Sequence, residues 1–348
     1  MNITIIGGAG FVGTRLTARL LAEGHSVKIA DKRRSEKYPE LWHRIDVRNK
    51  PDESNCFPES LTDKLAAPGA AEIAEQQPMN SLLDILQGSE VVINLSAEHR
   101  DDVTPTSLYD EVNVEGSAHV CEACTKLGIH KIMFTSSVAV YGFAPVGTDE
   151  TGKIDYFNDY GRTKFLAEGK YREWQTSDSN NCLTIIRPTV IFGEGNRGNV
   201  YNLLHQIASG RFPMVGDGKN RKSMNYVENV AAFLQFCINN GPGEHLFNYC
   251  DEPAYDMNSL VLDVYKYLGK PHKGIFHWPY WLGYMGGKCF DVLAFILHTK
   301  LPISSIRVKK FCQDTYFVGN NVKKTDFVAP VKLEDGLKTT IEYEFLKK

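Results

Sequence analysis

The sequence predicts an α/β fold in which a doubly wound parallel sheet is joined to a smaller α/β domain on its C-terminal side. Short apolar runs alternate with helical patterns over the first 250 residues, which is typical of a parallel sheet covered by helices. A glycine-rich turn follows the first run, and an acid ends the second. This combination is typical of a Rossmann domain. We expect residues 1–190 and about 224–250 to form that domain, and residues 191–223 and 251–348 to form the smaller one.

The bulk composition is that of an ordinary globular chain. Of the 348 residues, 43% are hydrophobic and 23% are charged, which suits one large domain or two joined ones. A formal net charge of -3 gives no indication of a nucleic-acid partner. The eight cysteines lack paired metal-ligand spacing, so we expect reduced thiols and no metal site. We find no secretory signal pattern and no uncharged apolar run of the roughly 18 residues needed to span a bilayer, and we expect a cytoplasmic protein.

The first strand and the turn after it predict a dinucleotide site. Residues 3–6 are an apolar strand, and residues 7–13 read GGAGFVG. A helical pattern follows and ends at Gly24. Glycines let the backbone turn tightly and approach a pyrophosphate, which then sits at the helix N-terminus. We therefore expect this turn to bind the cofactor through Gly7, Gly10, Phe11, Val12 and Gly13.

Asp31 ends the second strand, residues 27–30. Its carboxylate is placed to accept a hydrogen bond from a ribose 2′-hydroxyl, which favours NAD over NADP. The basic residues 32–34 come next and could meet a 2′-phosphate instead. We interpret them as a solvated basic turn because Asp31 is present.

The next stretch predicts two more strands separated by an insertion. A strand around Arg44 ends at Asp46 and Val47, where an acid could bond the adenine amino group. Residues 49–79 contain four prolines and many small or acidic residues, which indicates an irregular surface insertion. A short helix over residues 81–86 and a buried strand over residues 91–95 follow, and Ser96 and Ala97 would then pass close to the cofactor.

Polar residues crowd the end of that strand. Residues 98–102 read EHRDD, and ligands bind at the carboxyl ends of strands in an open parallel sheet. We interpret Glu98 and His99 as substrate contacts, with a charged surface loop as the alternative. The next helix is expected to start at Asn113, and its Cys121 and Cys124 fall on a face that we assign to core packing.

The strand over residues 131–134 leads to the residues with acid/base chemistry. It runs into Thr135-Ser136-Ser137, and a helix farther on carries Tyr160 and Lys164, four apart on one face. A phenol titrates at about 10, and a neighbouring cation favours the phenolate. The pair is therefore a candidate base, and a further strand over residues 183–186 ends near Pro188.

The second half holds two polar loops. Residues 192–199 are glycine-rich and lead into a helix, and residues 216–222 form a basic turn. A diphosphate is bound by cations and oriented amides. A helix from residue 226 then returns the chain to the first domain, and residues 245–249 read as the last strand.

These motifs together resemble the extended short-chain dehydrogenase/reductases, in their NAD-dependent sugar epimerase/dehydratase branch. The resemblance rests on the glycine turn, Asp31, NLSA at 94–97, NVEG at 113–116, the SS and VYG motifs at 136–142, Tyr160 with Lys164, and RP at 187–188. It implies that Tyr160 is the general base, that Lys164 holds the nicotinamide ribose and lowers the Tyr160 pKa, and that Ser137 bonds the reacting sugar oxygen. It also implies homodimers formed through a helix bundle that includes the Tyr160 helix.

The resemblance extends the set of binding residues. Further cofactor contacts are implied at Asp46, Val47, Leu95, Ser96, Ala97, Asn113 and Pro188. Substrate contacts are implied at Asn199 and at Lys222 or its neighbour Arg221, and we add Arg307 from the basic cluster 307–310. The dehydratases of this family carry an acidic pair at the positions of Ser136 and Ser137. Without a second acid, elimination lacks a proton donor, so an epimerase fits better.

Residues 274–302 are rich in aromatic and aliphatic side chains. Trp and Tyr are favoured at bilayer interfaces, and the basic residues that follow could meet anionic head groups. A monotopic membrane patch over about 275–300 is one interpretation, and a core helix or a dimer interface is the other.

A narrower resemblance links the chain to bacterial 4-epimerases that act on undecaprenyl-diphosphate N-acetylglucosamine. It covers residues 97–109, 184–204, 286–291 and 304–312. It implies conversion of lipid-linked GlcNAc to GalNAc at the cytoplasmic membrane face, for lipopolysaccharide or other surface polysaccharides. A UDP-sugar 4-epimerase is the first alternative, and an NAD(P)H-dependent 4-ketosugar reductase is another. A non-enzymatic dinucleotide sensor would not need Tyr160, Lys164 and Ser137 together.

Overall fold

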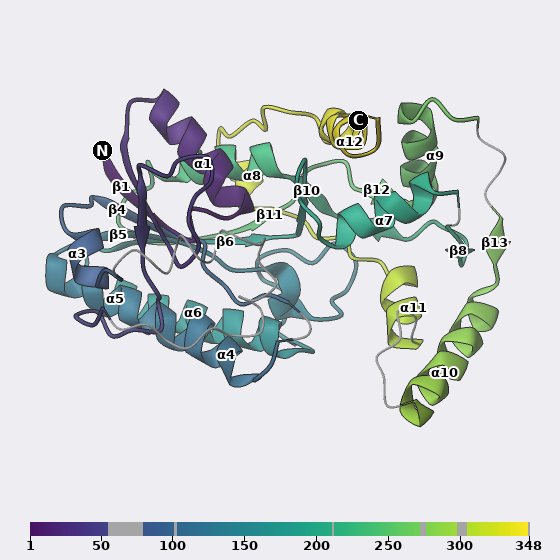
Figure 1. Ribbon diagram of the computed structural model, residues 1–348, viewed down its shortest axis with the longest axis horizontal. Helices are drawn as coiled ribbons and strands as arrows, with labels where there is room; N and C mark the ends of the chain where they lie inside the picture. The colour runs from purple at the N-terminus through teal and green to yellow at the C-terminus, as the bar shows by residue number, and fades with distance from the viewer. Residues whose placement is uncertain (55–78, 101–102, 211, 272–275, 298–304, 347–348) are drawn as a thin grey trace.

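The computed structural model describes residues 1–54, 79–100, 103–210, 212–271, 276–297 and 305–346. A sheet with helices on both faces makes up one half of the molecule, and a smaller lobe of helices and short strands makes up the other (Figure 1). The predicted α/β architecture is therefore confirmed. Most of the insertion expected at residues 49–79 lies outside the described residues.

The central sheet has seven strands, and every pairing in it is parallel. In spatial order the strands are β11 (Gly243–Tyr249), β6 (Cys182–Pro188), β5 (Lys131–Thr135), β4 (Val91–Asn94), β1 (Asn2–Ile6), β2 (Ser26–Asp31) and β3 (Trp42–Arg44). The chain order reverses between β1 and β4, where Ile6 pairs with Asn94. Ligands bind at such a switch point, at the carboxyl ends of the strands.

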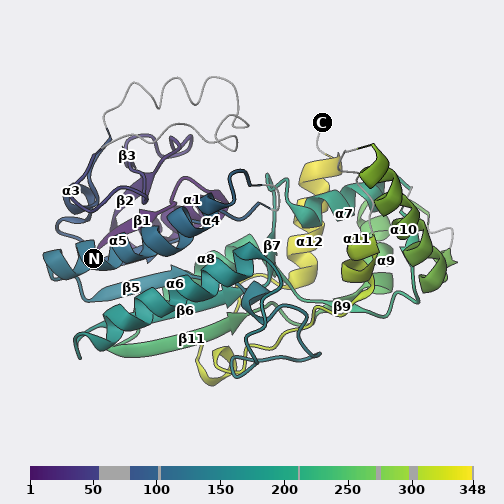
Figure 2. The same ribbon diagram turned by 90° about the horizontal axis from the view of Figure 1, so that it is seen from below.

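Helices cover both faces of the sheet (Figures 1 and 2). On one face lie α1 (Phe11–Ala22) and α8 (Val227–Cys237), which pack on each other. On the other lie α3 (Leu82–Leu86), α5 (Gly116–Leu127) and α6 (Asp159–Thr176). We expected a helix to start at Asn113. Instead α4 (Ser107–Tyr109) and the π-helical η1 (Asp110–Glu115) run directly into α5, so Asn113 lies inside a longer helical segment.

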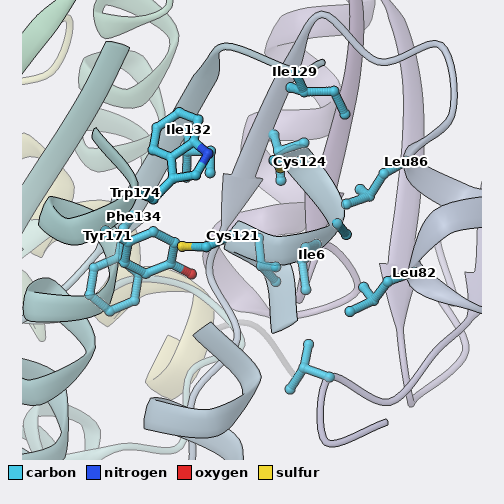
Figure 3. Close-up of a cluster of buried hydrophobic side chains, with 14 of the residues drawn as sticks. Ile6, Leu82, Leu86, Cys121, Cys124, Ile129, Ile132, Phe134, Tyr171 and Trp174 are labelled. Carbon is cyan, nitrogen blue, oxygen red and sulfur yellow. The ribbon is translucent and has the colours of Figure 1, made fainter. Parts of the chain in front are cut away.

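The core between the sheet and the α5–α6 face is fully apolar (Figure 3). Phe134 of β5 packs on the ring of Tyr171 of α6, with 4.6 Å between the ring centroids. Cys121 and Cys124 are buried in this cluster as free thiols, so their predicted role in packing is confirmed. Burying one large apolar side chain stabilises a fold by about 1.5–3 kcal/mol.

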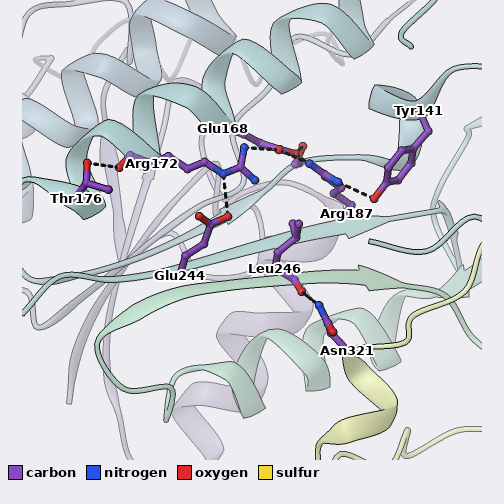
Figure 4. A network of polar contacts seen from close by, with 9 residues as sticks. Tyr141, Glu168, Arg172, Thr176, Arg187, Glu244, Leu246 and Asn321 are labelled. Atoms are coloured by element: carbon purple, nitrogen blue, oxygen red, sulfur yellow. Dashed lines mark hydrogen bonds and ion pairs between the residues drawn. The ribbon is translucent and has the colours of Figure 1, made fainter. Parts of the chain in front are cut away.

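A buried ion pair ties α6 to the sheet (Figure 4). Arg187 of β6 donates two hydrogen bonds to Glu168 of α6, at 2.8 and 2.5 Å, and a third to the Tyr141 hydroxyl at 2.6 Å. Glu168 is fully buried. Removing one partner of such a pair costs about 3–5 kcal/mol because the other charge is left buried and unpaired. Tyr141 ends the short 3₁₀ turn η2 (Val138–Tyr141), so the network also supports the segment that follows β5.

The smaller lobe is built around its own apolar core. Its helices are α7 (Asn199–Ala208), α9 (Met257–Tyr267), α10 (Tyr280–Ile296), α11 (Ser305–Cys312), α12 (Leu333–Ile341) and the π-helical η4 (Glu342–Leu346). Its strand pairs are β7 (Val190–Phe192) with β10 (Met224–Tyr226), β8 (Met214–Val215) with β13 (His277–Trp278), and β9 (Arg221–Lys222) with β12 (Tyr255–Asp256). Helix α10 projects from the lobe and packs on α11 (Figures 1 and 2).

One segment that we assigned to the smaller domain packs against the larger one. The Asn321 side chain donates to the Leu246 carbonyl of β11 at 2.9 Å, and η3 (Val322–Lys324) follows it. Phe327 meets the ring of Phe233 on α8 edge-on, at 4.9 Å between centroids. The chain therefore crosses between the two lobes once more after residue 312 than the sequence indicated.

Candidate active site

The glycine turn forms a cradle at the N-terminus of α1. A Cβ at Gly7 would lie 2.8 Å from the Ser96 backbone nitrogen, and one at Gly13 would lie 2.6 Å from Gly8. Gly7 also has a positive φ of 78°, which only glycine adopts without strain. Among the described residues no side chain caps α1, and its first turn holds no acid. The free backbone N–H groups there suit a pyrophosphate, so the turn fits NAD.

Asp31 lies beside the glycine turn. Its carboxylate accepts from the Ala9 backbone at 3.1 Å and from the Arg33 backbone at 3.0 Å, and the residue is buried. Burial raises the pKa of this carboxyl, and the Arg33 charge and the two N–H donors oppose that shift. The donors orient Asp31 beside the glycine turn, as the predicted ribose contact requires.

The other predicted cofactor residues line the same edge of the sheet. Leu95, Ser96 and Ala97 follow β4 directly beside the Gly7 turn, and Pro188 ends β6. Asp46 is bound by Arg48 through paired hydrogen bonds, the shortest at 2.5 Å. Its contact with an adenine amino group therefore stays a prediction.

Val47 and Asn113 have structural contacts of their own. Val47 packs closely on Gly116: a Cβ built at Gly116 would lie 2.8 Å from the Val47 side chain. The Asn113 amide accepts from the Glu98 backbone at 2.8 Å, and donates to the Glu98 carbonyl at 3.0 Å and to the Thr163 hydroxyl at 2.9 Å. It thereby fixes the residues after β4 to helix α6, a role that we did not anticipate.

Tyr160 and Lys164 lie in the first turns of α6. Asn158 caps this helix, and its side chain accepts from the Gly161 backbone at 2.9 Å. Lys164 is 2% exposed, donates to the Thr135 carbonyl at 2.7 Å, and lies 4.6 Å from the centre of the Phe134 ring. Tyr160 packs against the apolar group formed by Val103, Leu108 and Tyr109. The cap and these contacts hold both side chains at the carboxyl end of β5.

The two serines after β5 point in different directions. Ser137 is hydrogen-bonded to Tyr160, and its hydroxyl accepts from the Ala139 backbone at 3.1 Å. Ser136 is buried and donates to Glu168 at 2.6 Å. Only Ser137 therefore belongs to the acid/base group, whereas Ser136 belongs to the buried ion pair.

Burial affects both members of the pair. It raises the pKa of Tyr160, and the opposing contribution comes from the Ser137 hydrogen bond. Burial also lowers the pKa of Lys164 to about 7, against the attraction of Glu168. That Lys164 lowers the pKa of Tyr160 stays a prediction.

Glu98 and His99 both follow β4 at the mouth of this site. Glu98 is buried. The pKa of His99 is lowered, mainly by desolvation, and the Lys164 charge contributes in the same direction. His99 thus lies within electrostatic reach of Lys164, as a substrate contact would, and the predicted contacts of both residues remain predictions.

The predicted diphosphate contacts lie in the smaller lobe. Asn199 is exposed and begins α7, and the Lys222 ammonium donates to the Gln313 carbonyl at 2.6 Å. Burial lowers the pKa of Lys222 to about 8. Arg221 instead stacks over the Tyr316 ring at 4.0 Å, and which of the two contacts a diphosphate stays a prediction. The side chain of Arg307, on α11, lies outside the described residues.

A cavity of about 400 Å³ lies next to Lys222 in this lobe. Its lining comes from the turn after β8, the start of α10 and the end of α11: Gly216, Asp217, Tyr280, Lys309, Cys312 and Gln313. Cys312 and Gln313 were not identified from the sequence, because nothing local marks them. Their contacts with residues 215–222 arise only in the folded chain.

Among the residues that the structure describes, no group of three or more His, Cys, Asp or Glu side chains could hold a metal ion. In the same residues, one buried hydroxyl at the site lacks a hydrogen-bond partner, that of Thr135. It lies on the residue whose carbonyl binds Lys164, and it is a candidate polar contact for a bound group.

Comparisons with known proteins agree with this geometry. The family model described as the NAD dependent epimerase/dehydratase family matches residues 3–250. N-acetyl-alpha-D-glucosaminyl-diphospho-ditrans,octacis-undecaprenol 4-epimerase of Escherichia coli O157:H7 is 45% identical over 99% of this chain and 96% of its own.

Two solved structures share the fold. The UDP-glucose 4-epimerase of Thermotoga maritima, solved with UDP-glucose, superimposes with a TM-score of 0.69 at 20% identity. The UDP-glucuronic acid 4-epimerase of Bacillus cereus, solved with NAD, gives a TM-score of 0.68 at 17% identity. Each match covers 99% of this chain and 98% of the other.

Proposed function

The chain belongs to the NAD-dependent epimerase/dehydratase family, and we propose that it inverts C4 of N-acetylglucosamine carried on a polyprenyl diphosphate. It is an isomerase, and its cofactor is NAD. The observation that carries the substrate proposal is the 45% identity, over almost the whole chain, to an epimerase named for that substrate. The two UDP-sugar epimerase structures share the fold at 20% and 17% identity, and a UDP-sugar is the alternative substrate.

We assign the proton transfer to Tyr160. Its phenolate takes the proton of the C4 hydroxyl, and Ser137, bonded to Tyr160, also contacts that sugar oxygen. NAD, when bound, supplies reversible hydride acceptance from C4. Lys164, which the Thr135 carbonyl holds in place, would contact the nicotinamide ribose. The 4-keto sugar turns its other face within the site. The bound cofactor would then return the hydride to C4 and Tyr160 the proton to the C4 oxygen, so the cycle produces no net oxidation.

The serine pair supports epimerisation over dehydration. A dehydratase needs an acid that protonates the leaving hydroxyl. Two serines occupy the positions where dehydratases carry acids. Ser136 donates a hydrogen bond to the buried Glu168, and Ser137 faces Tyr160. Neither serine can act as that acid.

A lipid-linked substrate agrees with the apolar surface of α10, and we propose that residues 275–300 contact the cytoplasmic face of the inner membrane peripherally. Within the described part, Phe276 is 73%, Trp281 is 62% and Met285 is 57% exposed. Lys288 lies on the same helix, and Lys309 on the adjoining α11. In the described residues, no helix is both long and apolar enough to cross a bilayer.

We also propose that the protein is a homodimer that uses α6. Leu166 on this helix is 40% exposed. Three residues later, a Cβ at Gly169 would meet no described atom within 4 Å. This face of α6 is therefore open to a helix from a second copy.

The substrate proposal is tested by supplying each of the two candidate substrates. Purified protein is incubated with lipid-linked GlcNAc and, separately, with UDP-GlcNAc, without added cofactor. We expect GalNAc in the lipid pool, because NAD is regenerated in each cycle and stays bound. GalNAc found only in the UDP pool would refute the lipid substrate, and a strict requirement for NADPH would refute the epimerase.

A further inference from the structure

The C-terminal helical segment holds the loop in front of α7. Glu344, in η4, has a side chain that is only 2% exposed although it lies close to the end of the chain. Its carboxylate accepts from the Gly195 backbone at 2.8 Å and forms an ion pair with Arg197. A buried carboxylate that accepts charge-assisted bonds is among the stronger restraints that a side chain can supply.

The loop needs such a restraint. Residues 193–198 include three glycines, and Gly195 has a φ of +83°. Glycine has more conformational freedom than any other residue, so a glycine-rich loop is ordered mainly by contacts from outside. Within the loop, the Asn196 side chain donates to the Ile191 carbonyl at 3.0 Å and accepts from the Gly198 backbone at 3.0 Å.

The same loop is in contact with the cofactor side of the molecule. Arg15, on the helix that follows the glycine turn, donates to the Glu194 carbonyl at 3.1 Å. The Tyr226 hydroxyl donates to the Glu194 carboxylate at 2.9 Å. The loop is thus held from α1 and β10 at its start, and from η4 at its end.

Aromatic contacts extend the hold of η4 onto α7. The Arg197 guanidinium lies 4.4 Å from the centre of the Tyr201 ring. Phe345 stacks on that same ring, with 5.8 Å between centroids and 16° between planes. Asn199, the predicted diphosphate contact, lies between Arg197 and Tyr201 in the sequence, so η4 holds the residues on both sides of it.

We propose that Glu344 is a positioning residue for the sugar-diphosphate substrate. By holding Gly195 and Arg197 it fixes the start of α7, and with it Asn199, relative to the Tyr160 site. Glu344 does not touch the reacting atoms, so its removal weakens substrate binding and leaves proton and hydride transfer intact. The inference rests on the proposed function for the identity of the substrate.

The test compares three variants of the full-length enzyme. Glu344→Ala removes both contacts, and Glu344→Gln keeps an oxygen for the Gly195 N–H but loses the charge that binds Arg197. Glu342→Gln is the matched control, because Glu342 lies on the same segment and only its 3.9 Å ion pair with Lys338 changes. KM, kcat, retained NAD and thermal unfolding are measured for each.

For Glu344→Ala we expect KM to rise about tenfold or more, as a lost bond to a charged group implies, while kcat changes less than about threefold. Glu344→Gln should fall between that variant and the wild type, Glu342→Gln should match the wild type, and all three should retain NAD. An unchanged KM would overturn the proposal. A parallel loss of kcat, NAD and thermal stability in both Glu344 variants would overturn it as well, because that pattern is structural.

The outcome is separable from the substrate proposal. If the wild-type enzyme converts only UDP-GlcNAc, the lipid-linked substrate is refuted. The variants are then compared on UDP-GlcNAc, which carries the same diphosphate, and the KM ratio still tests Glu344.

Discussion

Two adjacent serines differ in function because the chain is extended as it leaves β5. Successive side chains of an extended segment point to opposite sides. The Ser136 backbone donates to the Ile186 carbonyl at 2.7 Å, and its side chain enters the core toward Glu168. Ser137 faces the other way, toward Tyr160.

Results

Sequence analysis

The sequence predicts an α/β fold in which a doubly wound parallel sheet is joined to a smaller α/β domain on its C-terminal side. Short apolar runs alternate with helical patterns over the first 250 residues, which is typical of a parallel sheet covered by helices. A glycine-rich turn follows the first run, and an acid ends the second. This combination is typical of a Rossmann domain. We expect residues 1–190 and about 224–250 to form that domain, and residues 191–223 and 251–348 to form the smaller one.

The bulk composition is that of an ordinary globular chain. Of the 348 residues, 43% are hydrophobic and 23% are charged, which suits one large domain or two joined ones. A formal net charge of -3 gives no indication of a nucleic-acid partner. The eight cysteines lack paired metal-ligand spacing, so we expect reduced thiols and no metal site. We find no secretory signal pattern and no uncharged apolar run of the roughly 18 residues that span a bilayer, and we expect a cytoplasmic protein.

The first strand and the turn after it predict a dinucleotide site. Residues 3–6 are an apolar strand, and residues 7–13 read GGAGFVG. A helical pattern follows and ends at Gly24. Glycines let the backbone turn tightly and approach a pyrophosphate, which then sits at the helix N-terminus. We therefore expect this turn to bind the cofactor through Gly7, Gly10, Phe11, Val12 and Gly13.

Asp31 ends the second strand, residues 27–30. Its carboxylate is placed to accept a hydrogen bond from a ribose 2′-hydroxyl, which favours NAD over NADP. The basic residues 32–34 come next and could meet a 2′-phosphate instead. We interpret them as a solvated basic turn because Asp31 is present.

The next stretch predicts two more strands separated by an insertion. A strand around Arg44 ends at Asp46 and Val47, where an acid could bond the adenine amino group. Residues 49–79 contain four prolines and many small or acidic residues, which indicates an irregular surface insertion. A short helix over residues 81–86 and a buried strand over residues 91–95 follow, and Ser96 and Ala97 would then pass close to the cofactor.

Polar residues crowd the end of that strand. Residues 98–102 read EHRDD, and ligands bind at the carboxyl ends of strands in an open parallel sheet. We interpret Glu98 and His99 as substrate contacts, with a charged surface loop as the alternative. The next helix is expected to start at Asn113, and its Cys121 and Cys124 fall on a face that we assign to core packing.

The strand over residues 131–134 leads to the residues with acid/base chemistry. It runs into Thr135-Ser136-Ser137, and a helix farther on carries Tyr160 and Lys164, four apart on one face. A phenol titrates at about 10, and a neighbouring cation favours the phenolate. The pair is therefore a candidate base. A further strand over residues 183–186 ends near Pro188.

The second half holds two polar loops. Residues 192–199 are glycine-rich and lead into a helix, and residues 216–222 form a basic turn. Cations and oriented amides are the groups that bind a diphosphate. A helix from residue 226 then returns the chain to the first domain, and residues 245–249 read as the last strand.

These motifs together resemble the extended short-chain dehydrogenase/reductases, in their NAD-dependent sugar epimerase/dehydratase branch. The resemblance rests on the glycine turn, Asp31, NLSA at 94–97, NVEG at 113–116, the SS and VYG motifs at 136–142, Tyr160 with Lys164, and RP at 187–188. It implies that Tyr160 is the general base, that Lys164 holds the nicotinamide ribose and lowers the Tyr160 pKa, and that Ser137 bonds the reacting sugar oxygen. It also implies homodimers formed through a helix bundle that includes the Tyr160 helix.

The resemblance extends the set of binding residues. Further cofactor contacts are implied at Asp46, Val47, Leu95, Ser96, Ala97, Asn113 and Pro188. Substrate contacts are implied at Asn199 and at Lys222 or its neighbour Arg221, and we add Arg307 from the basic cluster 307–310. The dehydratases of this family carry an acidic pair at the positions of Ser136 and Ser137. Without a second acid, elimination lacks a proton donor, so an epimerase fits better.

Residues 274–302 are rich in aromatic and aliphatic side chains. Trp and Tyr are favoured at bilayer interfaces, and the basic residues that follow could meet anionic head groups. A monotopic membrane patch over about 275–300 is one interpretation, and a core helix or a dimer interface is the other.

A narrower resemblance links the chain to bacterial 4-epimerases that act on undecaprenyl-diphosphate N-acetylglucosamine. It covers residues 97–109, 184–204, 286–291 and 304–312. It implies conversion of lipid-linked GlcNAc to GalNAc at the cytoplasmic membrane face, for lipopolysaccharide or other surface polysaccharides. A UDP-sugar 4-epimerase is the first alternative, and an NAD(P)H-dependent 4-ketosugar reductase is another. A non-enzymatic dinucleotide sensor would not need Tyr160, Lys164 and Ser137 together.

Overall fold

The computed structural model describes residues 1–54, 79–100, 103–210, 212–271, 276–297 and 305–346. A sheet with helices on both faces makes up one half of the molecule, and a smaller lobe of helices and short strands makes up the other (Figure 1). The predicted α/β architecture is therefore confirmed. Most of the insertion expected at residues 49–79 lies outside the described residues.

The central sheet has seven strands, and every pairing in it is parallel. In spatial order the strands are β11 (Gly243–Tyr249), β6 (Cys182–Pro188), β5 (Lys131–Thr135), β4 (Val91–Asn94), β1 (Asn2–Ile6), β2 (Ser26–Asp31) and β3 (Trp42–Arg44). The chain order reverses between β1 and β4, where Ile6 pairs with Asn94. Ligands bind at such a switch point, at the carboxyl ends of the strands.

Helices cover both faces of the sheet (Figures 1 and 2). On one face lie α1 (Phe11–Ala22) and α8 (Val227–Cys237), which pack on each other. On the other lie α3 (Leu82–Leu86), α5 (Gly116–Leu127) and α6 (Asp159–Thr176). We expected a helix to start at Asn113. Instead α4 (Ser107–Tyr109) and the π-helical η1 (Asp110–Glu115) run directly into α5, so Asn113 lies inside a longer helical segment.

The core between the sheet and the α5–α6 face is a cluster of buried, mostly apolar side chains (Figure 3). Phe134 of β5 packs on the ring of Tyr171 of α6, with 4.6 Å between the ring centroids. Cys121 and Cys124 are buried in this cluster as free thiols, so their predicted role in packing is confirmed. Burying one large apolar side chain stabilises a fold by about 1.5–3 kcal/mol.

A buried ion pair ties α6 to the sheet (Figure 4). Arg187 of β6 donates two hydrogen bonds to Glu168 of α6, at 2.8 and 2.5 Å, and a third to the Tyr141 hydroxyl at 2.6 Å. Removing one partner of such a pair costs about 3–5 kcal/mol, because the other charge is left buried and unpaired. Tyr141 ends the short 3₁₀ turn η2 (Val138–Tyr141), so the network also supports the segment that follows β5.

The smaller lobe is built around its own apolar core. Its helices are α7 (Asn199–Ala208), α9 (Met257–Tyr267), α10 (Tyr280–Ile296), α11 (Ser305–Cys312), α12 (Leu333–Ile341) and the π-helical η4 (Glu342–Leu346). Its strand pairs are β7 (Val190–Phe192) with β10 (Met224–Tyr226), β8 (Met214–Val215) with β13 (His277–Trp278), and β9 (Arg221–Lys222) with β12 (Tyr255–Asp256). Helix α10 projects from the lobe and packs on α11 (Figures 1 and 2).

One segment that we assigned to the smaller domain packs against the larger one. The Asn321 side chain donates to the Leu246 carbonyl of β11 at 2.9 Å, and η3 (Val322–Lys324) follows it. Phe327 meets the ring of Phe233 on α8 edge-on, at 4.9 Å between centroids. The chain therefore returns to the larger domain after α11, which the sequence did not indicate.

Candidate active site

The glycine turn forms a cradle at the N-terminus of α1. A Cβ at Gly7 would lie 2.8 Å from the Ser96 backbone nitrogen, and one at Gly13 would lie 2.6 Å from Gly8. Gly7 also has a positive φ of 78°, which glycine adopts without strain. Among the described residues no side chain caps α1, and its first turn holds no acid. Backbone N–H groups at such a helix end suit a pyrophosphate, so the turn fits NAD.

Asp31 lies beside the glycine turn. Its carboxylate accepts from the Ala9 backbone at 3.1 Å and from the Arg33 backbone at 3.0 Å, and the residue is buried. Burial raises the pKa of this carboxyl, and the Arg33 charge and the two N–H donors oppose that shift. The donors orient Asp31 beside the glycine turn, as the predicted ribose contact requires.

The other predicted cofactor residues line the same edge of the sheet. Residues 95–97 follow β4 directly beside the Gly7 turn, and Pro188 ends β6. Asp46 is bound by Arg48 through paired hydrogen bonds, the shortest at 2.5 Å. Its contact with an adenine amino group therefore stays a prediction.

Val47 and Asn113 have structural contacts of their own. Val47 packs closely on Gly116: a Cβ built at Gly116 would lie 2.8 Å from the Val47 side chain. The Asn113 amide accepts from the Glu98 backbone at 2.8 Å, and donates to the Glu98 carbonyl at 3.0 Å and to the Thr163 hydroxyl at 2.9 Å. It thereby fixes the residues after β4 to helix α6, a role that we did not anticipate.

Tyr160 and Lys164 lie in the first turns of α6. Asn158 caps this helix, and its side chain accepts from the Gly161 backbone at 2.9 Å. Lys164 is 2% exposed and donates to the Thr135 carbonyl at 2.7 Å. Tyr160 packs against a small apolar group formed by Val103, Leu108 and Tyr109. The cap and these contacts hold both side chains at the carboxyl end of β5.

The two serines after β5 point in different directions. Ser137 is hydrogen-bonded to Tyr160, and its hydroxyl accepts from the Ala139 backbone at 3.1 Å. Ser136 is buried and donates to Glu168 at 2.6 Å. Only Ser137 therefore belongs to the acid/base group, whereas Ser136 belongs to the buried ion pair.

Burial affects both members of the pair. It raises the pKa of Tyr160, and the opposing contribution comes from the Ser137 hydrogen bond. Burial also lowers the pKa of Lys164 to about 7, against the attraction of Glu168. That Lys164 lowers the pKa of Tyr160 stays a prediction.

Glu98 and His99 both follow β4 at the mouth of this site. Glu98 is buried. The pKa of His99 is lowered, mainly by desolvation, and the Lys164 charge contributes in the same direction. His99 thus lies within electrostatic reach of Lys164, as a substrate contact would. The substrate contacts of both residues remain predictions, and residues 101–102 of this polar run lie outside the described residues.

The predicted diphosphate contacts lie in the smaller lobe. Asn199 is exposed and begins α7, and the Lys222 ammonium donates to the Gln313 carbonyl at 2.6 Å. Burial lowers the pKa of Lys222 to about 8. Arg221 instead stacks over the Tyr316 ring at 4.0 Å, and which of the two contacts a diphosphate stays a prediction.

A cavity of about 400 Å³ lies next to Lys222 in this lobe. Its lining comes from the turn after β8, the start of α10 and the end of α11: Gly216, Asp217, Tyr280, Lys309, Cys312 and Gln313. Cys312 and Gln313 were not identified from the sequence, because their contacts with residues 215–222 arise only in the folded chain. Arg307 also belongs to α11, but its side chain lies outside the described residues.

Among the residues that the structure describes, no group of three or more His, Cys, Asp or Glu side chains could hold a metal ion. In the same residues, one buried hydroxyl at the site lacks a hydrogen-bond partner, that of Thr135. Because the Thr135 carbonyl binds Lys164, this hydroxyl is a candidate polar contact for a bound group.

Comparisons with known proteins agree with this geometry. The family model described as the NAD dependent epimerase/dehydratase family matches residues 3–250. N-acetyl-alpha-D-glucosaminyl-diphospho-ditrans,octacis-undecaprenol 4-epimerase of Escherichia coli O157:H7 is 45% identical to this chain, over 99% of this chain and 96% of its own.

Two solved structures share the fold. The UDP-glucose 4-epimerase of Thermotoga maritima, solved with UDP-glucose, superimposes with a TM-score of 0.69 at 20% identity. The UDP-glucuronic acid 4-epimerase of Bacillus cereus, solved with NAD, gives a TM-score of 0.68 at 17% identity. Each match covers 99% of this chain and 98% of the other.

Proposed function

The chain belongs to the NAD-dependent epimerase/dehydratase family, and we propose that it inverts C4 of N-acetylglucosamine carried on a polyprenyl diphosphate. It is an isomerase, and its cofactor is NAD. The observation that carries the substrate proposal is the 45% identity, over almost the whole chain, to an epimerase named for that substrate. The two UDP-sugar epimerase structures share the fold at 20% and 17% identity, and a UDP-sugar is the alternative substrate.

We assign the proton transfer to Tyr160. Its phenolate takes the proton of the C4 hydroxyl, and Ser137, bonded to Tyr160, also contacts that sugar oxygen. NAD, when bound, supplies reversible acceptance of the hydride from C4. Lys164, which the Thr135 carbonyl holds in place, would contact the nicotinamide ribose. The 4-keto sugar turns its other face within the site. The bound cofactor would then return the hydride to C4 and Tyr160 the proton to the C4 oxygen, so the cycle produces no net oxidation.

The serine pair supports epimerisation over dehydration. A dehydratase needs an acid that protonates the leaving hydroxyl. Two serines occupy the positions where dehydratases carry acids. Ser136 donates a hydrogen bond to the buried Glu168, and Ser137 faces Tyr160. Neither serine supplies that acid.

A lipid-linked substrate agrees with the apolar surface of α10, and we propose that residues 275–300 contact the cytoplasmic face of the inner membrane peripherally. Residues 275 and 298–300 lie outside the described residues, but Phe276 is 73%, Trp281 is 62% and Met285 is 57% exposed. Lys288 lies on the same helix, and Lys309 on the adjoining α11. In the described part of the chain, no helix has both the length and the apolar character needed to cross a bilayer.

We also propose that the protein is a homodimer that uses α6. Leu166 on this helix is 40% exposed. Three residues later, a Cβ at Gly169 would meet no described atom within 4 Å. The open space there would admit a helix from a second copy.

The substrate proposal is tested by supplying each of the two candidate substrates. Purified protein is incubated with lipid-linked GlcNAc and, separately, with UDP-GlcNAc, without added cofactor. We expect GalNAc in the lipid pool, because the reaction needs no net supply of cofactor. GalNAc found only in the UDP pool would refute the lipid substrate, and a strict requirement for NADPH would refute the epimerase.

A further inference from the structure

The helical segment after α12 holds the loop in front of α7. Glu344, in η4, has a side chain that is only 2% exposed. Its carboxylate accepts from the Gly195 backbone at 2.8 Å and forms an ion pair with Arg197. Hydrogen bonds that involve an ionised group are about twice as strong as neutral ones, so a buried carboxylate is an effective restraint on a loop.

The loop needs such a restraint. Residues 193–198 include three glycines, and Gly195 has a φ of +83°. Glycine has more conformational freedom than any other residue, so a glycine-rich loop is ordered mainly by contacts with its surroundings. Within the loop, the Asn196 side chain donates to the Ile191 carbonyl at 3.0 Å and accepts from the Gly198 backbone at 3.0 Å.

The same loop is in contact with the cofactor side of the molecule. Arg15, on the helix that follows the glycine turn, donates to the Glu194 carbonyl at 3.1 Å. The Tyr226 hydroxyl donates to the Glu194 carboxylate at 2.9 Å. The loop is thus held from α1 and β10 at its start, and from η4 at its middle and end.

Aromatic contacts extend the hold of η4 onto α7. The Arg197 guanidinium lies 4.4 Å from the centre of the Tyr201 ring. Phe345 stacks on that same ring, with 5.8 Å between centroids and 16° between planes. Asn199, the predicted diphosphate contact, lies between Arg197 and Tyr201 in the sequence, so η4 holds the residues on both sides of it.

We propose that Glu344 is a positioning residue for the sugar-diphosphate substrate. By holding Gly195 and Arg197 it fixes the start of α7, and with it Asn199, relative to the Tyr160 site. Glu344 does not touch the reacting atoms, so its removal weakens substrate binding and leaves proton transfer intact. The inference rests on the proposed function for the identity of the substrate.

The test compares three variants of the full-length enzyme. Glu344→Ala removes both contacts, and Glu344→Gln keeps an oxygen for the Gly195 N–H but loses the charge that binds Arg197. Glu342→Gln is the matched control, because Glu342 lies on the same segment and its ion pair, with Lys338, is a loose one at 3.9 Å. KM, kcat, retained NAD and thermal unfolding are measured for each variant.

For Glu344→Ala we expect KM to rise about tenfold or more, as the loss of a bond to a charged group implies, while kcat changes less than about threefold. Glu344→Gln should fall between that variant and the wild type, Glu342→Gln should match the wild type, and all three should retain NAD. An unchanged KM would overturn the proposal. A joint loss of kcat, NAD and thermal stability in both Glu344 variants would overturn it as well, because that pattern indicates a purely structural role.

The outcome is separable from the substrate proposal. If the wild-type enzyme converts only UDP-GlcNAc, the lipid-linked substrate is refuted. The variants are then compared on UDP-GlcNAc, which carries the same diphosphate, and the KM ratio still tests Glu344.

Discussion

At the residue scale, two adjacent serines differ in function because the chain is still extended as it leaves β5. Successive side chains of an extended segment point to opposite sides. The Ser136 backbone donates to the Ile186 carbonyl at 2.7 Å, and its side chain enters the core toward Glu168. Ser137 faces the other way, toward Tyr160.

This difference predicts distinct effects of two alanine substitutions. The Ser137 bond lowers the pKa of Tyr160 while burial raises it, so Ser137→Ala should raise that pKa further. Because the phenolate is the active form, the rise of kcat/KM with pH should move to higher pH. At neutral pH the rate should fall about tenfold for each unit of that shift. A pH–rate profile measures it.

Ser136→Ala is the matched control. It removes the 2.6 Å hydrogen bond to buried Glu168, and should lower the free energy of unfolding by about 1.5–3 kcal/mol. Its pH–rate profile should keep the wild-type position, because Ser136 does not contact Tyr160. A displaced profile for Ser136→Ala, or an unmoved one for Ser137→Ala, would contradict the assignment.

The base itself is tested by Tyr160→Phe. This change removes the proton acceptor and leaves the glycine turn intact, so kcat should fall by about 10²–10⁴-fold while NAD stays bound to the purified protein. Tyr171→Phe, on the same helix, loses hydrogen bonds in the core, with Asn94 at 2.7 Å and with Ser117, and should turn over normally. Near-normal turnover by Tyr160→Phe would place the base elsewhere.

At the element scale, α6 couples the chemistry to the core. Tyr160, Lys164 and Glu168 follow one another at intervals of four, which places them along one face. Glu168 opposes the desolvation that lowers the Lys164 pKa, and Arg187 binds Glu168 from the sheet. The position of the proposed catalytic pair therefore depends on an ion pair about one helical turn from Lys164 and two from Tyr160.

Helix α10 and the strand β13 before it carry the prediction at this scale. Replacing Trp278 and Trp281 together by Ser should weaken binding to anionic vesicles roughly tenfold or more, since each buried large apolar side chain contributes about 1.5–3 kcal/mol. Co-sedimentation of the protein with the vesicles measures the effect.

Val328→Ser is the control for that experiment. Val328 is 82% exposed but lies outside α10 and α11, so its substitution should leave vesicle binding unchanged. Unaltered binding by the tryptophan double variant, together with a change of its oligomeric state, would identify this surface as a dimer interface instead.

At the scale of the whole molecule, the site lies at the junction of two lobes, and the chain crosses between these lobes several times. The chain leaves the sheet after β6, returns through β10 and α8, leaves again after β11, and returns once more at Asn321 and Phe327. The loop at residues 193–198 adds a further link through Arg15. These crossings fix the smaller lobe against the Tyr160 site.

The quaternary prediction belongs to this scale. Leu166→Arg places a charge on the open face of α6, and burying an unpaired charge is costly, so the variant should elute as a monomer where the wild type elutes as a dimer. Leu262→Arg, at a residue that is 44% exposed on α9, should not change the mass. Light scattering after size exclusion gives both masses, and a dimeric Leu166→Arg would exclude this interface.

Local patterns were enough to predict much of the fold and the centre of the site. The strands near residues 3, 27, 91, 131, 183 and 245 were predicted to within a few residues, because each is a short apolar run bounded by turn-forming or polar residues. The glycine turn and the Tyr160–Lys164 spacing are also readable over fewer than ten residues. The helix start expected at Asn113 was wrong, because the helical segment begins earlier; the hydrogen-bond partners of Asn113 lie after β4 and on α6.

The sequence by itself determined the fold class and the family, and it predicted the NAD turn with Asp31 and the acid/base pair, since these depend on residue types at fixed short spacings. Only the tertiary structure decided which serine faces Tyr160 and that burial raises the Tyr160 pKa. It also decided that α10 is exposed, and that Glu344 holds a loop whose Gly195 is 149 residues away in the sequence. Desolvation and long-range pairing depend on which surfaces the fold brings together, and short-range patterns contain no information about that.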